Sequence, residues 1–81
     1  MHENLNENYF KTSDLSLIAL LQVFGYKIKK IKREETNKVI FFIEKDNKLD
    51  SLIQSFWSRS LSVEPLAYFE SLKNIKSRIY Q

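Results

Sequence analysis

The chain contains no cysteine, one glycine, one proline and one histidine. Without cysteine it can form neither a disulfide nor a thiolate metal site, and a single histidine does not complete a zinc site. Loops that cradle phosphates need several glycines, and Gly25 stands alone. His2 lies in a polar segment, where it is poorly placed to activate a serine nucleophile. We therefore predict a protein that is not an enzyme and that uses no cofactor or metal ion.

Long apolar runs are also missing. The longest are the five-residue stretches LIALL and VIFFI, far shorter than the roughly 20 residues of a membrane-spanning helix. The opening residues, MHENLNEN, lack the apolar segment of a secretory signal. We therefore expect a cytoplasmic protein whose partner is neither a membrane nor a small molecule. We also expect residues 1–8 to form a flexible tail before a single domain over residues 9–81.

Residues 15–24, LSLIALLQVF, are predicted to form a helix of unusual composition. Ser13 or Asp14 can cap its start, and Gly25 can end it in the left-handed conformation. Eight of its ten residues are apolar, whereas an ordinary surface helix has one apolar stripe. Two interpretations fit this pattern: a central helix that the rest of the chain covers, or a helix that also contributes an interface between copies of the chain.

Residues 26–33 and 38–44 are predicted to form an antiparallel β-hairpin, because the second segment is rich in β-branched and aromatic residues. If residues 36–37 are its two-residue loop, Glu35 faces Lys38 and Lys29 faces Glu44 across the hairpin. Strict alternation fails between Ile28 and Ile31, which indicates a bulge or a shifted register. The predicted faces are Ile28, Val39, Phe41 and Ile43 on one side, and Ile31, Ile40 and Phe42 on the other.

Two further helices complete the predicted fold. Asp46 or Asn47 begins the first, whose apolar residues repeat with helical spacing up to Trp57. Glu64 precedes Pro65 at the first position of the second. The order is (β)-α-β-β-α-α, an α+β domain with three helices on a small antiparallel hairpin, or on three strands if residues 9–12 also pair. The inward residues of the last helix are predicted to be Leu66, Phe69, Leu72, Ile75 and Ile79.

Three segments resemble a family of small bacterial and phage domains of unknown function. They are YFKTSDLSLIALLQVFGYKI, VIFFIEKDNKLDSLIQSFW and VEPLAYFESLKNIKSRIY, which together span nearly the whole chain. The family features are a Thr-Ser-Asp helix opening, a glycine that ends this helix, an aromatic strand, and Val-x-Pro with an aromatic before a lysine-bearing helix. The resemblance implies a self-contained prokaryotic-type domain and carries over no activity. The matching positions are Thr12, Ser13, Asp14, Gly25, Phe41, Val63, Pro65 and Phe69.

Five of the seven residues from Lys27 to Arg33 are basic. They carry +5 while the whole chain carries +3, so the other residues sum to −2. One interpretation is a strand that binds nucleic-acid phosphates without reading sequence, with Tyr26, Phe42 or Trp57 offering faces on which bases stack. The residues predicted to bind phosphate are Lys27, Lys29, Lys30, Lys32 and Arg33.

A structural role fits the same basic residues. Lysines on an exposed sheet edge prevent edge-to-edge association. Strict alternation would place Lys27, Lys29 and Arg33 on one face and Lys30 and Lys32 on the other. The two glutamates that follow reduce the local positive charge. The segment is therefore either a phosphate-binding surface or a protected edge.

The alternative function is association with a protein partner or with a second copy of the chain. It would use the apolar helix of residues 15–24 and the hairpin face that carries Phe42. Trp57 next to Arg59 is a candidate anchor, since tryptophan and arginine contribute much of the binding energy at interfaces. A structural alternative is that Trp57 closes the core.

Overall fold

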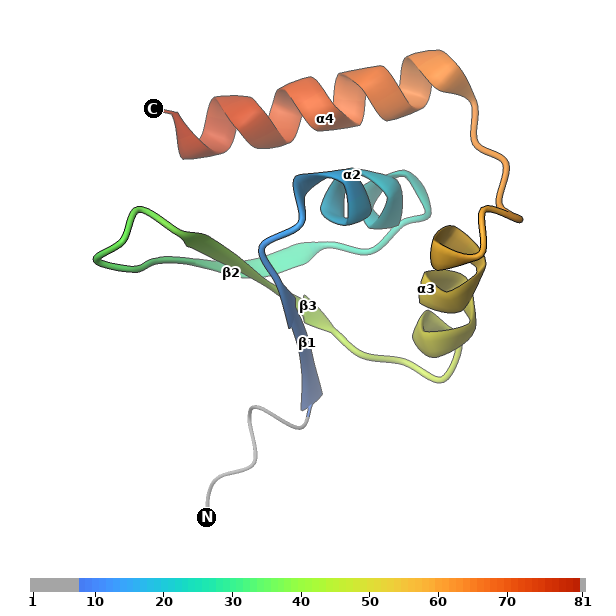
Figure 1. Ribbon diagram of the computed structural model, residues 1–81, viewed down its shortest axis with the longest axis horizontal. Helices are drawn as coiled ribbons and strands as arrows, with labels where there is room; N and C mark the ends of the chain where they lie inside the picture. Colours follow the sequence, from blue (N-terminus) through green and yellow to red (C-terminus); the bar gives the residue numbers. More distant parts are fainter. Residues whose placement is uncertain (1–7, 81) are drawn as a thin grey trace.

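The computed structural model describes residues 8–80 and contains six elements within them. They form an α+β domain with one antiparallel sheet in the strand order β1-β3-β2 (Figure 1). The predicted order of elements is confirmed, and the segment at residues 9–12 is the third strand. The elements are β1 (Tyr9–Thr12), α2 (Leu15–Val23), β2 (Ile28–Arg33), β3 (Val39–Glu44), α3 (Leu49–Trp57) and α4 (Pro65–Ile79).

The predicted tail of residues 1–8 lies outside the described residues except for Asn8. The carbonyl of Asn8 accepts a hydrogen bond from the Lys45 backbone N–H at 3.0 Å. This bond continues the ladder between β1 and β3, so the pairing begins one residue before the predicted domain start.

Helix α2 lies between the sheet and α4 (Figure 1). Its residues from Leu17 to Leu21 are all buried, which requires neighbours on every side of the helix. The interpretation of a covered central helix is therefore confirmed. This stretch of α2 leaves no free apolar surface for a partner.

Both ends of α2 follow the predicted local chemistry. The Asp14 carboxylate accepts backbone N–H groups from Ser16 at 2.9 Å and from Leu17 at 3.3 Å, which satisfies donors that have no partner inside the helix. Gly25 follows the helix with φ +97°, a conformation that costs glycine little because it has no Cβ. The chain can therefore reverse at Gly25 and enter β2.

The hairpin loop is longer than predicted. Arg33 pairs with Val39, and the Asn37 N–H donates to the Glu34 carbonyl at 3.0 Å, so the loop has three residues, 35–37. Asn37 takes φ 68°, and asparagine tolerates this left-handed region better than most residues. The two-residue loop at 36–37 was wrong: its turn types need a positive φ at Thr36, which a β-branched residue resists, whereas the three-residue loop needs it at Asn37 alone.

The predicted irregularity in β2 is a bulge. The register shifts between Ile28, which pairs with Ile43, and Lys30, which pairs with Phe42. The bulge lets Ile28 and Ile31 lie on the same face although they are three residues apart. Ile31 pairs with Phe41 and packs against the core, so its predicted place on the opposite face was wrong.

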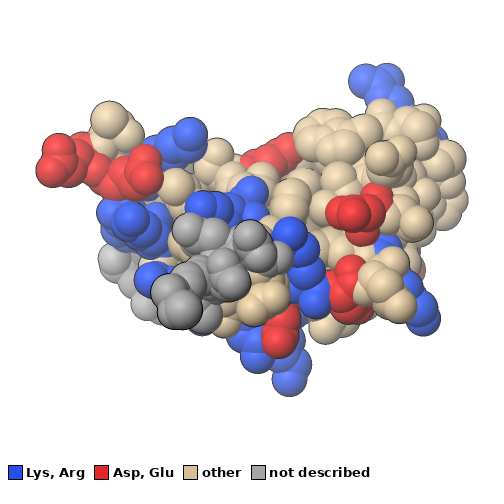
Figure 2. All heavy atoms as spheres, turned by 90° about the horizontal axis from the view of Figure 1, so that it is seen from below, with Lys and Arg blue, Asp and Glu red and all other residues tan. Residues whose placement is uncertain are grey.

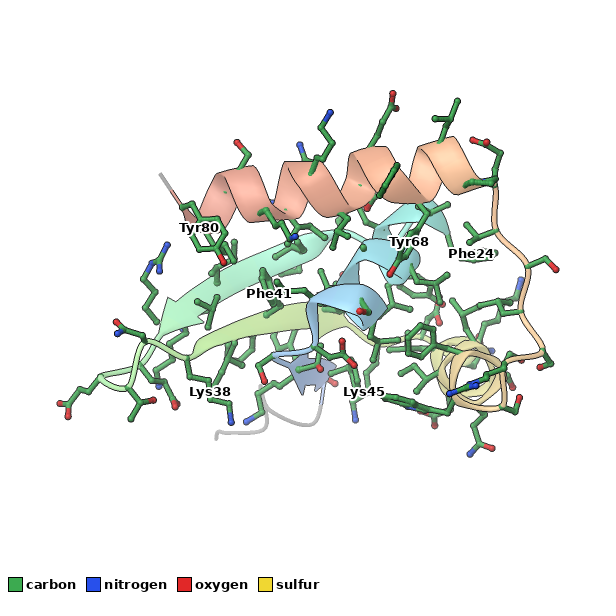
Figure 3. The ribbon with its side chains drawn as sticks, turned by 45° about the horizontal axis from the view of Figure 1, so that its top comes forward. Phe24, Lys38, Phe41, Lys45, Tyr68 and Tyr80 are labelled. Atoms are coloured by element: carbon green, nitrogen blue, oxygen red, sulfur yellow. The ribbon has the colours of Figure 1, made fainter. Side chains whose placement is uncertain are left out.

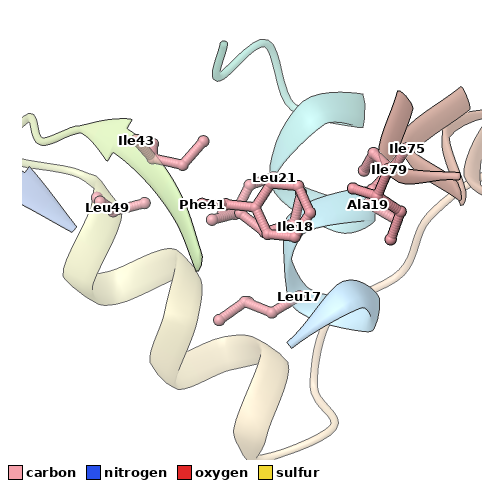
Figure 4. Close-up of a cluster of buried hydrophobic side chains, with 9 residues drawn as sticks. All are labelled: Leu17, Ile18, Ala19, Leu21, Phe41, Ile43, Leu49, Ile75 and Ile79. Carbon is pink, nitrogen blue, oxygen red and sulfur yellow. The ribbon is translucent and has the colours of Figure 1, made fainter. Parts of the chain in front are cut away.

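The core lies between the inner face of the sheet and the helices (Figure 4). Phe41 is completely buried at its centre, and α3 contributes Leu49 from the side. The prediction of Asp46 or Asn47 as the cap of α3 was wrong, because Lys48 is the N-cap and makes no side-chain cap hydrogen bond. The Asp46 carboxylate instead accepts the backbone N–H of Lys48, ahead of the helix, at 3.0 Å. The buried cluster is Leu17, Ile18, Ala19, Leu21, Phe41, Ile43, Leu49, Ile75 and Ile79.

Helix α4 begins as predicted, with Glu64 as its N-cap and Pro65 at the first position. Its inward face differs from the prediction, because Leu66 is 66% and Phe69 is 64% exposed. The buried side of α4 is formed instead by Ser71, Ile75 and Ile79, which follow one another at intervals of four residues.

Ser71 explains how α4 lies close to α2. Its hydroxyl donates to the Ala19 carbonyl at 2.8 Å, so the buried hydroxyl is satisfied. Ala19 is itself fully buried. Because both side chains are small, the two helix backbones can approach each other closely.

Candidate nucleic-acid interface

The two faces of the sheet have different surroundings. Helices α2 and α4 both lie on one side of it (Figure 1). Phe41 points toward these helices, whereas Lys38 extends to the opposite side (Figure 3). Because side chains alternate along β3, Ile40 and Phe42 share the side of Lys38. No helix among residues 8–80 covers this second face, and we call it the open face.

Phe42 is the centre of the open face. It pairs with Lys11 on β1 and with Lys30 on β2, so the central aromatic has a lysine on either side. The Lys11 Nζ lies 5.9 Å and the Lys30 Nζ 5.4 Å from the centroid of the Phe42 ring. Tyr9 meets the same ring edge-on, with the centroids 6.2 Å apart. These contacts hold two ammonium groups near an aromatic surface.

The lysine cluster extends toward the hairpin loop. Lys32 pairs with Ile40, next to a shallow depression of about 390 Å³. Figure 2 shows this side of the molecule: lysine and arginine atoms gather on its left half, and acidic atoms lie at the hairpin tip at the far left, at the lower edge and on the right half. Glu34 is the acidic residue at the rim of the depression. We define the basic face as Lys11, Lys30, Lys32 and Lys38 around Ile40 and Phe42.

The predicted basic strand is divided by the fold. Lys30 and Lys32 belong to the basic face, while Lys27 and Lys29 line a separate depression that also contains Glu44 and Asp46. The Lys29 Nζ lies 3.8 Å from a Glu44 carboxylate oxygen. The acidic neighbours reduce the attraction of this second depression for phosphate.

Arg33 has a structural contact instead of a place on the basic face. Its guanidinium donates to the Ile79 carbonyl at the end of α4. A cation at a helix C-terminus is favourable, because the last carbonyls have no partner in the helix and carry partial negative charge. Arg33 therefore ties the hairpin to α4.

One comparison with known proteins gives a match. A family model described as a domain of unknown function, DUF5659, matches residues 7–81. The chain belongs to the DUF5659 family. This match confirms the resemblance to a family of domains of unknown function, and it spans every element from β1 to α4. No curated protein and no solved structure matches the chain. Among the residues that the structure describes, no helix has the length and apolar character needed to cross a membrane.

Two residues of the basic face in this DUF5659 domain were not predicted. Lys11 is the single lysine of a short strand, and its position opposite Phe42 depends on β1 pairing with β3. Lys38 was predicted to lie in the hairpin, but the side of the sheet to which it extends was not predicted. The two-residue period of a strand places Tyr9 and Lys11 of YFKT on one face and Phe10 and Thr12 on the other, and this signal could have given the face of Lys11.

The candidate protein contacts of the DUF5659 domain lie on different surfaces. Phe42 is half-buried on the open face, and Trp57 is 61% exposed at the end of α3. The interpretation that Trp57 closes the core was therefore wrong; Phe56 takes that role and meets Trp57 edge-on at 4.9 Å between centroids. Arg59 is exposed and has φ 60°.

Tyr26 and Asp46 connect the end of α2 to the start of α3. The Tyr26 hydroxyl donates to Asp46 Oδ1 at 2.7 Å. Partial burial and this hydrogen bond raise the pKa of Tyr26 to about 12, because both favour the neutral phenol. The same hydrogen bond, together with the N–H of Lys48, lowers the pKa of Asp46, because donors stabilise the carboxylate.

We predict that Tyr26→Phe makes the free energy of unfolding depend less on pH, both at acid and at alkaline pH. The raised pKa of Tyr26 stabilises the fold at pH values below 10.0, and that stability is lost as the pH rises toward about 12. The lowered pKa of Asp46 stabilises the fold above 3.8, and that stability is lost as the pH falls. Urea unfolding of both proteins at acid, neutral and alkaline pH measures the difference. Parallel pH profiles for the two proteins would contradict the pairing.

Proposed function

We propose that this domain is a non-catalytic module that binds the phosphate backbone of single-stranded nucleic acid through its basic face. The observation that carries the proposal is the pair of ammonium groups, from Lys11 and Lys30, on either side of the Phe42 ring. Surfaces that bind single strands without sequence preference combine backbone-tracking cations with aromatic faces. A sheet face that no helix of residues 8–80 covers provides room for both.

The charges support backbone contact over base reading. All four basic residues of the basic face are lysines, which attract phosphate as point charges but lack the two-pronged geometry of arginine. If all four neutralise phosphates on a single strand, the logarithm of the binding constant should fall with the logarithm of salt concentration with a slope of about −3.

Edge protection alone does not explain the whole basic face. It accounts for Lys30 and Lys32 on β2 and for Lys11 on β1, because these are the two edge strands. Lys38, however, immediately precedes the central strand β3. Its side chain still extends to the open side of the sheet (Figure 3). A function for the whole face accounts for all four lysines together.

The test is fluorescence anisotropy of labelled single-stranded DNA, duplex DNA and RNA at several salt concentrations. We expect the tightest binding for single strands. The variant Lys11→Glu/Lys30→Glu should bind about tenfold or more weakly, with a salt slope shallower by about 1.4. The control Lys48→Glu/Arg78→Glu changes the net charge equally away from the basic face and should bind as the wild type does.

Two outcomes would overturn the proposal. One is that the wild type binds none of the oligonucleotides at low salt. The other is that the control variant loses as much affinity as the Lys11→Glu/Lys30→Glu variant, because the net charge of the chain would then explain the binding. Circular dichroism spectra of both variants establish that they are folded.

A further inference from the structure

The outer side of α4 is a second surface that the proposed function does not use. Helix α4 covers α2 with the side that carries Ser71, Ile75 and Ile79. Its opposite side faces away from the other described elements (Figure 1). Leu66 and Phe69 lie there, with about two thirds of each side chain exposed. Two large apolar side chains one turn apart on a helix are characteristic of an interaction site.

The exposed apolar residues are part of a longer pattern. We define the outer stripe as Leu66, Phe69, Lys73, Lys76 and Tyr80. Their alternating spacing of three and four residues is that of the contact positions in a coiled coil. The first half of the stripe is apolar, and Lys73 and Lys76 make the following part basic.

From this pattern we infer that the outer stripe binds a second copy of the chain, with the two α4 helices antiparallel. A parallel pair would place Lys73 against Lys73 and Lys76 against Lys76, and like charges at contact positions repel. In an antiparallel pair, Phe69 of each copy faces Lys73 of the other, and Leu66 faces Lys76. An ammonium group over an aromatic ring is attracted to it, and a lysine stem covers apolar surface while its charge stays in water.

The charges beside the stripe favour the same arrangement. The first half of α4 carries Glu70, after the Glu64 cap, and the second half carries Lys73, Lys76 and Arg78. An antiparallel pair sets the acidic half of each helix against the basic half of the other. The two halves of α4 carry opposite charges, so the α4 helix of a second, antiparallel copy complements both halves at once. A second copy therefore fits this surface better than a partner of unrelated charge.

The dimer would be weak, because a single pair of helices gives an interface at the small end of specific ones. It is independent of the proposed function, since the basic face lies on the far side of the sheet from α4 (Figure 1). Loss of either activity can therefore be observed without loss of the other.

Sedimentation equilibrium over a wide range of protein concentration tests the dimer. We expect the wild type to approach twice its chain mass of 9.7 kDa. Phe69→Lys should remain monomeric, because it sets an ammonium group against Lys73 of the other copy. Asn74→Lys adds the same charge on the flank of α4 and should dimerise as the wild type does. A wild type that stays monomeric at millimolar concentration would overturn the inference. So would a Phe69→Lys variant that dimerises normally and retains the wild-type circular dichroism spectrum.

Cysteine cross-linking tests the orientation, because the chain has no cysteine of its own. In an antiparallel pair, a mixture of Leu66→Cys and Lys76→Cys chains should form a disulfide between the two different variants. Lys76→Cys alone should not, since its two copies lie about 15 Å apart along the helix axes. Efficient cross-linking of Lys76→Cys with itself would show a parallel pair and contradict the proposed arrangement.

Discussion

Phe41→Ala is expected to lower the free energy of unfolding by about 3–5 kcal/mol, the usual cost of removing a buried phenylalanine side chain. Phe41 is fully buried, and its ring lies among residues of α2 and the sheet (Figure 4). A chain of 81 residues has a total stability of roughly 4–12 kcal/mol. This one substitution should therefore remove a large part of it, and the variant should unfold at a much lower urea concentration than the wild type.

Phe42→Ala is the matched control for this prediction. It makes the same chemical change at the next residue, on the open face, where the ring is only half-buried. We expect a much smaller loss of stability in urea unfolding followed by circular dichroism. Equal losses for the two variants would contradict the assignment of the inner and open faces. The folded Phe42→Ala protein should also bind single strands more weakly, since it lacks the aromatic surface between Lys11 and Lys30.

Ile75→Ala is expected to cost about 2–5 kcal/mol, the usual range for a fully buried isoleucine. Ile75 is completely buried in the middle of the side of α4 that covers α2. Its loss leaves a cavity between the two helices, and α2 depends on α4 to cover its outer side. We therefore expect α4 to separate from α2 more readily in this variant.

Urea unfolding and binding of an apolar fluorescent dye measure this effect. Ile75→Ala should unfold at lower urea and bind more dye below its transition. Asn74→Ala, at the neighbouring exposed position, should change neither quantity appreciably. If Ile75→Ala proved as stable as Asn74→Ala, the close packing of α4 on α2 would be refuted.

Local chemistry explains which parts of the fold could be predicted. The two ends of α2, at Asp14 and Gly25, and the start of α4 at Pro65 depend on residues close in sequence, and all three were predicted. The amphipathic pattern of α3 and the β-rich composition of β3 were also sufficient to place these elements. The same patterns predict whether a segment is a helix or a strand, but they do not specify which elements lie side by side.

The features that sequence reasoning missed depend on long-range packing. The buried side of α4 includes Ser71, a polar residue that pattern reasoning assigns to water; its burial depends on the Ala19 carbonyl of another helix. The apolar Leu66 and Phe69 consequently face outward. Likewise, Lys11 joins the basic face because β1 pairs with β3; YFKT has the pattern of a strand, but no residue near Lys11 specifies which strand it pairs with.

The position of α2 also has a consequence for how the chain is made. Protein synthesis proceeds from the N-terminus at roughly 5–20 residues per second, and α2 ends at Val23, whereas the helix that covers it begins at Pro65. For a few seconds at this rate, a nascent chain carries the apolar segment Leu17–Leu21 without its final cover. This apolar segment is thus made early, and its burial is complete only when α4 has been synthesised.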